Sequence, residues 1–138
     1  MTVTPDLLRS VPLFAAMSDH SIELVAGLFQ EVAYADGATL VRQGDPGEEF
    51  IVLLEGRARV EQQGHLLHEL GAGDFLGEIS LLDGRPRTAT VVATYPVRAM
   101  IARRTDFMRL IDEHRAIRYS VLTALTERVR HAAPSPGD

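Results

Sequence analysis

Residues 75–91 read FLGEISLLDGRPRTATV, and this stretch differs from the short strands and glycine turns expected on both sides of it. The residues that lead into its helical turn are rich in glycine, with Gly71, Gly73 and Gly77. One helical turn is expected next, then a tight turn, then a strand that opens with arginine. Glycine lets the backbone come close to a ligand, and the first turn of a helix offers amide groups and a partial positive charge. The stretch therefore predicts an anion site made chiefly of main chain.

Arg87 and Glu78 add side-chain chemistry to this predicted site. A guanidinium can pair with a phosphate through two charge-assisted hydrogen bonds. An ionised carboxylate only accepts hydrogen bonds, so beside an anion it needs a donor such as a ribose hydroxyl. Taken alone, Glu78 could instead serve only to stabilise the helix dipole, and Arg87 could be an ordinary surface charge. Together, among glycines, they favour a site for a nucleotide monophosphate.

Around this stretch, residues 31–102 alternate between short apolar segments and turns rich in glycine. Many short strands with regular glycine turns are typical of an antiparallel sandwich or barrel. Residues 57–62 alternate between polar and apolar, and Gln63-Gly64 after them predicts a hairpin tip. The expected strands are 39–42, 50–54, 58–62, 66–70, 88–93 and 97–102.

Helices are expected on both sides of the strands. Residues 5–30 have helical spacing of apolar residues, with Ser18-Asp19 as the N-cap of a helix over 20–29. After the strands, Thr105-Asp106 is expected to cap a short turn, and a longer helix to run from about 116 to 130.

The pattern predicts a mainly β fold with flanking helices in one domain, residues 1–131. Within it, residues 5–30 would form the N-terminal helices, 31–102 the strands and 103–131 the C-terminal helices. Residues 132–138, with two prolines and a glycine, are expected to form a disordered tail.

Composition excludes several classes of function. The 138 residues carry a formal net charge of −5, which argues against nucleic acid as the main partner. The chain has no cysteine, which excludes disulfides and zinc–cysteine sites, and no lysine, which excludes Schiff-base chemistry and a Walker-type phosphate site. No apolar run is long enough to span a membrane, and the N-terminus lacks the pattern of a secretory signal. A cytoplasmic location is therefore expected.

The stretch 77–91 closely resembles the phosphate-binding cassette of the cyclic nucleotide-binding domain family. That family includes catabolite activator proteins, regulatory subunits of the cyclic-AMP-dependent kinase and cyclic-nucleotide-gated channels. The shared pattern is Gly-Glu-aliphatic-small-Leu, here Gly77–Leu81, and then Pro-Arg-small-Ala-Thr-Val, here Pro86–Val91. The resemblance also takes in Leu13-Phe14, Gly37, Gly44-Asp45 before Phe50, Gly56 and Gly71–Phe75. It implies an antiparallel jelly-roll β-roll with N-terminal helices and C-terminal hinge and lid helices.

Carried over by position, the resemblance implies that Glu78 binds the ribose 2′-hydroxyl and Arg87 the cyclic phosphate. Thr88 would lie beside both the phosphate and the purine. The backbone amides that would share the phosphate are those near Gly77, Ile79 and Ser80. Regular strand alternation would place Arg87 and Thr88 on opposite faces, so their joint role requires an irregular strand start.

The last predicted helix carries an apolar stripe, which favours packing against the roll. The resemblance implies a second role for this helix, as a lid that closes over the base. The candidate lid contacts are Ile117, Arg118, Leu122, Leu125 and Arg128. Either of the two arginines could stack on the purine through a cation–π contact.

His65 and His68 form His-Leu-Leu-His, which raises the alternative of a cupin-like metal enzyme, since cupins are also jelly rolls. Positions three apart on a regular strand face opposite sides, so the two histidines are not expected to chelate one ion. No metal, no cofactor and no catalytic residue is therefore expected.

The expected function is a regulatory sensor that binds a cyclic mononucleotide, with cyclic AMP (cAMP) favoured over cyclic GMP (cGMP). Residues 103–138 are too few for a helix-turn-helix domain, so the output is expected to pass to an unknown effector domain or protein. Binding would close the terminal helix as a population shift. A nucleotide-independent protein-interaction β-roll is the second alternative, and a cyclic dinucleotide ligand and the oligomeric state stay open.

Overall fold

The structure, a computed structural model, describes residues 3–132 and the side chains of residues 3–127. Over this range the strands form two four-stranded antiparallel sheets. The first sheet has the order β1 (Gln30–Tyr34), β8 (Val97–Arg103), β3 (Glu49–Glu55) and β6 (Phe75–Leu76). The second has the order β2 (Thr39–Val41), β7 (Thr90–Ala93), β4 (Ala58–Gln62) and β5 (His65–Leu70). This confirms the predicted fold class, a mainly β roll with flanking helices.

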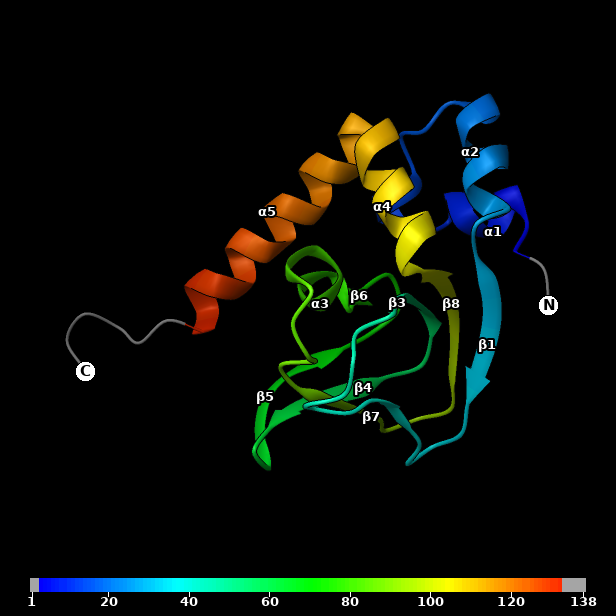
Figure 1. Ribbon diagram of the computed structural model, residues 1–138. Coiled ribbons are helices and arrows are strands. Elements are labelled where there is room, and N and C mark those ends of the chain that lie inside the picture. The colour runs from blue at the N-terminus through cyan, green and yellow to red at the C-terminus, as the bar shows by residue number, and fades with distance from the viewer. Residues whose placement is uncertain (1–2, 133–138) are drawn as a thin grey trace.

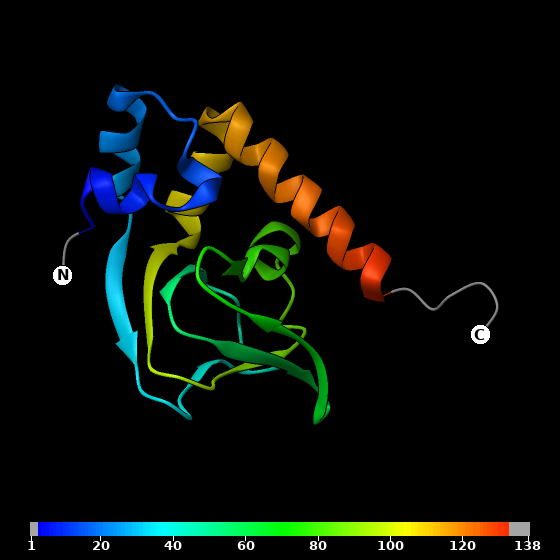
Figure 2. The same ribbon diagram turned by 180° about the vertical axis from the view of Figure 1, so that it is seen from behind.

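Helices precede, interrupt and follow the strands. They are α1 (Pro5–Arg9), the 3-10 turn η1 (Pro12–Phe14), α2 (Asp19–Ala26), α3 (Glu78–Asp83), α4 (Arg104–Glu113) and α5 (Arg115–Ala132). Figure 1 shows α1, α2 and α4 gathered at one end of the roll, with α5 leading away from them past α3. The view from behind shows the same arrangement (Figure 2). No helix among residues 3–132 combines the length and the apolar character that crossing a membrane requires.

Helix boundaries follow capping chemistry in one place and differ from expectation in another. Ser18 is the N-cap of α2, where its hydroxyl accepts a hydrogen bond from the amide of Ser21 (3.2 Å), as predicted. Thr105 and Asp106 do not cap α4, because the chain passes directly from β8 into the helix at Arg104. The predicted tail falls outside the described residues, except Ala132, which belongs to α5.

The central strand β3 explains why the fold has two cores. Its residues 50–53 are all buried, and successive side chains point to opposite faces of the sheet. Phe50 and Val52 join a cluster between the first sheet and the helices. Ile51 and Leu53 join a second cluster between the two sheets. The first sheet is therefore the middle layer of the molecule.

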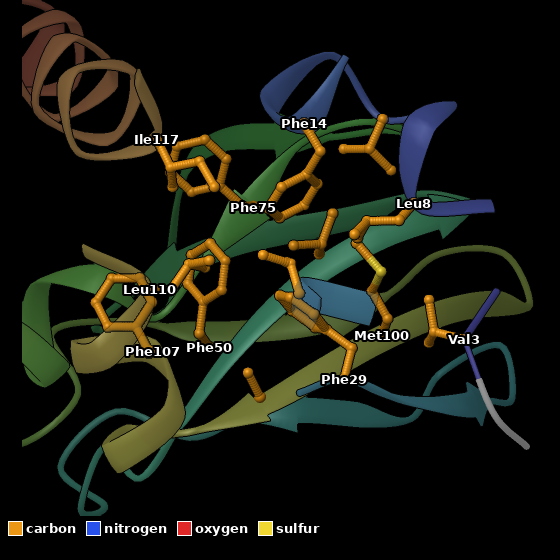
Figure 3. Packing of buried hydrophobic residues seen from close by; sticks show 14 of the residues in the cluster. Val3, Leu8, Phe14, Phe29, Phe50, Phe75, Met100, Phe107, Leu110 and Ile117 are labelled. Carbon is orange, nitrogen blue, oxygen red and sulfur yellow. The ribbon is translucent and has the colours of Figure 1, made fainter. Parts of the chain in front are cut away.

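Five aromatic rings form the centre of the cluster beneath the helices (Figure 3). Phe50 has the central place, with its ring centroid 4.6 Å from that of Phe107 on α4 and 5.5 Å from that of Phe75. Phe29 links it to Phe14, whose ring meets that of Phe29 edge-on at 5.6 Å. Ring contacts of this kind add to the hydrophobic stabilisation of the buried area. They fix η1 and α4 to the roll.

The β4–β5 hairpin forms where the sequence predicts it. Gln63 and Gly64 both have positive φ, 52° and 81°, as the two central residues of a type I′ turn require. Strands β1 and β6 were not predicted: β1 begins at Gln30, inside the range assigned to helices, and β6 has only two residues. Both owe their conformation to pairing with β8 and β3, which local sequence does not reveal.

Candidate functional site

A cavity of about 730 Å³ lies between β4, β5, α3 and the segment before β7. Small-molecule sites commonly have volumes of about 300–1,000 Å³. The cavity is lined by every ligand-binding residue expected from the sequence: Gly77, Glu78, Ile79, Ser80, Arg87 and Thr88. The fold thus brings the whole expected set to one place.

A second cavity also touches Arg87, between β2 and the loop that follows it. Its volume is about 280 Å³, and none of its lining residues comes from α3. It is therefore smaller than most ligand sites and lacks the helix amides that favour an anion. The larger cavity is the better candidate.

Arg87 is buried beside the larger cavity, with 7% of its surface exposed. Its Nη1 donates a hydrogen bond to the carbonyl of Gly77 (3.1 Å), and its Nη2 donates one to the carbonyl of Glu49 (2.8 Å). Burial lowers the pKa of Arg87, whereas the carboxylates of Glu49, Glu78 and Glu48 raise it. Since an arginine pKa starts far above neutrality, the side chain remains a cation held in a fixed position.

Gly77 allows α3 to begin directly against this guanidinium. It is the N-cap of the helix and has a φ of 96°. A Cβ atom at this position would lie 2.6 Å from Nη1 of Arg87 and 2.6 Å from the carbonyl oxygen of Glu49. Only glycine combines this backbone conformation with so close an approach.

The first turn of α3 supplies backbone donors next to Arg87. The first hydrogen bond within the helix runs from the amide of Leu81 to the carbonyl of Gly77 (3.3 Å). The amides of residues 78–80 come before this bond and have no acceptor inside the helix. The partial positive charge of the helix start adds to that of the guanidinium. This corner of the cavity therefore suits a small anion.

Glu78 places a carboxylate next to the anion-binding corner. The residue is fully buried, with 0% of its surface exposed, and lines the cavity from the first turn of α3. Its negative charge acts on Arg87. Because an ionised carboxylate only accepts hydrogen bonds, a ligand there must offer a donor such as a hydroxyl. Features for an anion and for a hydroxyl thus lie side by side.

Arg87 and Thr88 line the cavity together because both precede the regular strand. The sequence predicted a strand from residue 88, whereas β7 begins at Thr90. The backbone of Arg87 instead pairs with the loop before β3, through bonds from Gly44 N to Arg87 O (2.9 Å) and from Arg87 N to Asp45 O (2.8 Å). Strict alternation therefore does not apply at these two positions.

Sequence reasoning missed the part of the cavity formed by β4 and β5. Val60, Gln62 and residues 66–70 line this part. The alternation across residues 57–62 is a signal that places Val60 and Gln62 on one face. Strand β5 carries no comparable signal.

A β-bulge in β5 determines where its histidines point. His68 pairs with Val60 and His65 with Gln62, and the register shifts between these pairs. Because Val60 and Gln62 are two residues apart on β4, their partners lie on the same face of the sheet. The prediction that the two histidines face opposite sides was wrong, since the bulge inserts one extra residue between them. Residues 3–127 nevertheless contain no group of three or more metal-ligating side chains suited to an ion.

The candidate lid residues have different surroundings. Leu125 lines the cavity from α5. Ile117 is fully buried in the core beneath the helices, Leu122 is 52% exposed, and Arg118 is half-buried; none of these three lines the cavity. The side chain of Arg128 lies outside the described ones. The start of α5 packs on α4 and η1, which explains why Ile117 points into the core.

The sequence matches a known protein family. A family model described as "Cyclic nucleotide-binding domain" matches residues 31–114, which include the whole cassette stretch. The cAMP-dependent protein kinase regulatory subunit of Colletotrichum orbiculare is 33% identical over 108 residues, which make up 77% of this chain and 28% of that protein. The chain therefore spans less than a third of the length of that relative.

Solved structures show the same architecture. Cyclic-AMP-bound PfPKA-R superposes with a TM-score of 0.84 at 24% identity, over 92% of this chain and 44% of that one. The catabolite activator protein of Thermus thermophilus gives a TM-score of 0.78 at 29% identity, over 88% of this chain and 59% of that one.

Proposed function

The chain belongs to the cyclic nucleotide-binding domain family, and we propose that it is a sensor module that binds cAMP in the larger cavity. The observation that carries this proposal is the meeting of a buried guanidinium, a helix start and a buried carboxylate at one cavity. In this proposal the module regulates another domain or protein and performs no catalysis itself.

The phosphate is assigned to Arg87 and the amides of residues 78–80. A guanidinium has five N–H donors, and the bonds to Gly77 and Glu49 orient the group while a cyclic phosphate engages others. A cation already held by the protein loses little conformational freedom when the anion binds. Phosphate binding therefore takes place on a preformed surface.

The ribose is assigned to Glu78. A 2′-hydroxyl would donate to the buried carboxylate, and a deoxyribose would leave that carboxylate without this bond. The preference for adenine over guanine rests on the name of the kinase regulatory subunit that this chain resembles at 33% identity.

The output is assigned to the C-terminal helices. Helix α3 contacts α4, and α4 contacts α5, so a change at the cassette has a packed route to the end of the chain. Leu125 on α5 already reaches the cavity. A nucleotide that contacts α5 in one position better than in another shifts the population of that helix.

Calorimetric titration of the purified chain with cAMP tests the proposal. Arg87→Leu should weaken binding by at least about 30-fold, because it removes a buried charge from a phosphate pair. Arg87→Lys should restore little, since an ammonium lacks the planar fork. Arg85→Leu is the matched control, because Arg85 is exposed, lies two residues away and does not line the cavity.

Thermal unfolding provides the second readout. At a cAMP concentration 100 times the dissociation constant, the wild type should gain about 2.7 kcal/mol of stability. A folded wild type that binds neither cAMP nor cGMP would contradict the proposal. Full affinity in Arg87→Leu would show that the phosphate binds elsewhere.

A further inference from the structure

Strand β5 contributes an ionisable side chain, His68, to the larger cavity. His68 pairs directly with Val60 and therefore lies on the same face of the second sheet; Val60 is 7% exposed and also lines the cavity. His65 lies on the same face of the sheet as His68 but does not line the cavity. His68 is exposed, so its imidazole can exchange protons with solvent.

The position of His68 decides which part of a nucleotide it would meet. The proposed phosphate and ribose contacts, Arg87 and Glu78, both lie in the cassette. Apart from the cassette and neighbouring residues, the cavity is lined mainly by β4 and β5, with Leu125 from α5. A purine that extends away from the sugar therefore lies against these two strands, where Gln62 and His68 are polar and the surrounding positions are largely leucine and valine.

We propose, as a deepening of the proposed function, that His68 contacts the purine edge and that its protonation shifts the base preference from adenine towards guanine. A neutral imidazole has one nitrogen that accepts a hydrogen bond, whereas an imidazolium only donates. Adenine offers one acceptor and one amino donor on its N7 edge, and guanine offers two acceptors, N7 and O6. The charged form therefore matches guanine and loses its acceptor for the amino group of adenine.

The other charged groups around the cavity ordinarily do not change their charge between about pH 6 and pH 8, whereas an imidazole does. They are Glu78 and Arg87 of the cassette, Glu69 beside His68, and Asp74 before β6. Strand β4 and helix α5 contribute uncharged side chains to the described lining. Carboxylates and guanidinium groups ordinarily keep their charge between about pH 6 and pH 8, whereas an imidazole changes its charge there. A change of base preference over this range thus points to a histidine.

Calorimetry on the full chain with cAMP and with cGMP, each at pH 6.0 and pH 8.0, tests the inference. On going from pH 8.0 to pH 6.0, the ratio of the cGMP to the cAMP dissociation constant should fall by roughly three- to tenfold, the size of one ordinary hydrogen bond. His68→Gln should make the ratio independent of pH, because an amide donates and accepts at every pH. His68→Asn provides a second variant with the same amide chemistry, and His65→Gln is the matched control that should behave like the wild type.

The outcomes separate this inference from the proposed function. Binding of both nucleotides with a ratio that is the same at the two pH values would overturn the role of His68 and leave the cAMP site standing. A pH-dependent ratio that survives in both His68 variants, or that disappears in His65→Gln, would overturn it as well. Failure of the wild type to bind either nucleotide at both pH values would instead overturn the proposed function.

Discussion

At Arg87, opposing electrostatic effects act on one buried cation. Burial lowers the pKa of its guanidinium, and the carboxylates of Glu49, Glu78 and Glu48 act in the opposite direction. Its two bonds to backbone carbonyls add geometric restraint, because Gly77 and Glu49 lie on different elements. The charge is thus held in the protein interior by bonds to two backbone carbonyls, which leaves it suited to an external anion.

Glu78→Gln tests the residue assigned to the ribose. An amide accepts a weaker hydrogen bond than a carboxylate, so the preference for cAMP over 2′-deoxy-cAMP should shrink by roughly tenfold. Competition binding with the two nucleotides measures the ratio. Glu23→Gln on α2, exposed and distant in sequence from the cassette, should leave it unchanged. Equal discrimination in the wild type and Glu78→Gln would mean that another group binds the 2′-hydroxyl.

Among the elements, the loop between β2 and β3 supports the cassette from behind. Its backbone pairs with Arg87 on one side, and Gly47 packs against Ser80 on the other. A Cβ atom on Gly47 would lie 2.2 Å from the Cβ of Ser80 and 3.4 Å from Cζ of Arg87. Because Ser80 is only 3% exposed, it has little space into which to move. The position of the guanidinium therefore depends on a glycine outside the cassette.

Gly47→Ala should consequently weaken both the fold and the site. The overlap with Ser80 should cost about 1–3 kcal/mol of unfolding free energy, as overpacking in a dense core does. The displaced cassette should also bind cAMP less tightly. Thermal denaturation and calorimetry measure the two effects. Gly71→Ala is the control, because a Cβ there meets nothing within 4 Å and no positive φ is involved; similar losses in both variants would contradict this account.

For the whole molecule, the roll and the terminal helix differ in how firmly they are held. The core beneath the helices fixes α2 and α4 against the first sheet. Helix α5 packs on α4 and η1 through its first turns, and then leads past α3 with Leu122 exposed (Figure 1). An element held at one end is the natural candidate to move when a ligand occupies the adjacent cavity.

Distance measurements between spin labels test this motion. The chain has no cysteine, so labels attach only at introduced sites. For the pair Thr126→Cys and His65→Cys, saturating cAMP should shorten the distance between α5 and the roll, because the bound base gives α5 a surface to contact. A pair within the roll, Tyr95→Cys and His65→Cys, should keep its distance. If neither distance changes while cAMP binds, the output does not pass through α5.

Several features of this protein could be predicted because local sequence patterns encode them. The glycines, Glu78 and Arg87 predict an anion-and-hydroxyl site because their spacing sets the chemistry of one short segment. Gln63-Gly64 predicts its hairpin because few residues tolerate positive φ. The residues 50–53 also predict a strand from local information, because residues of high β propensity lie between turns.

Which side chains share the cavity with the cassette depends instead on long-range pairing and packing. His68 shares the cavity because the register between β4 and β5 pairs it with Val60, and β5 alone does not encode that register. Likewise, Ile117 and Leu125 carry the same apolar character in one helix, yet the first is buried in the core and the second reaches the cavity. The physical reason is that register and helix packing minimise the free energy of the whole chain, so a side chain's environment depends on partners far away in sequence.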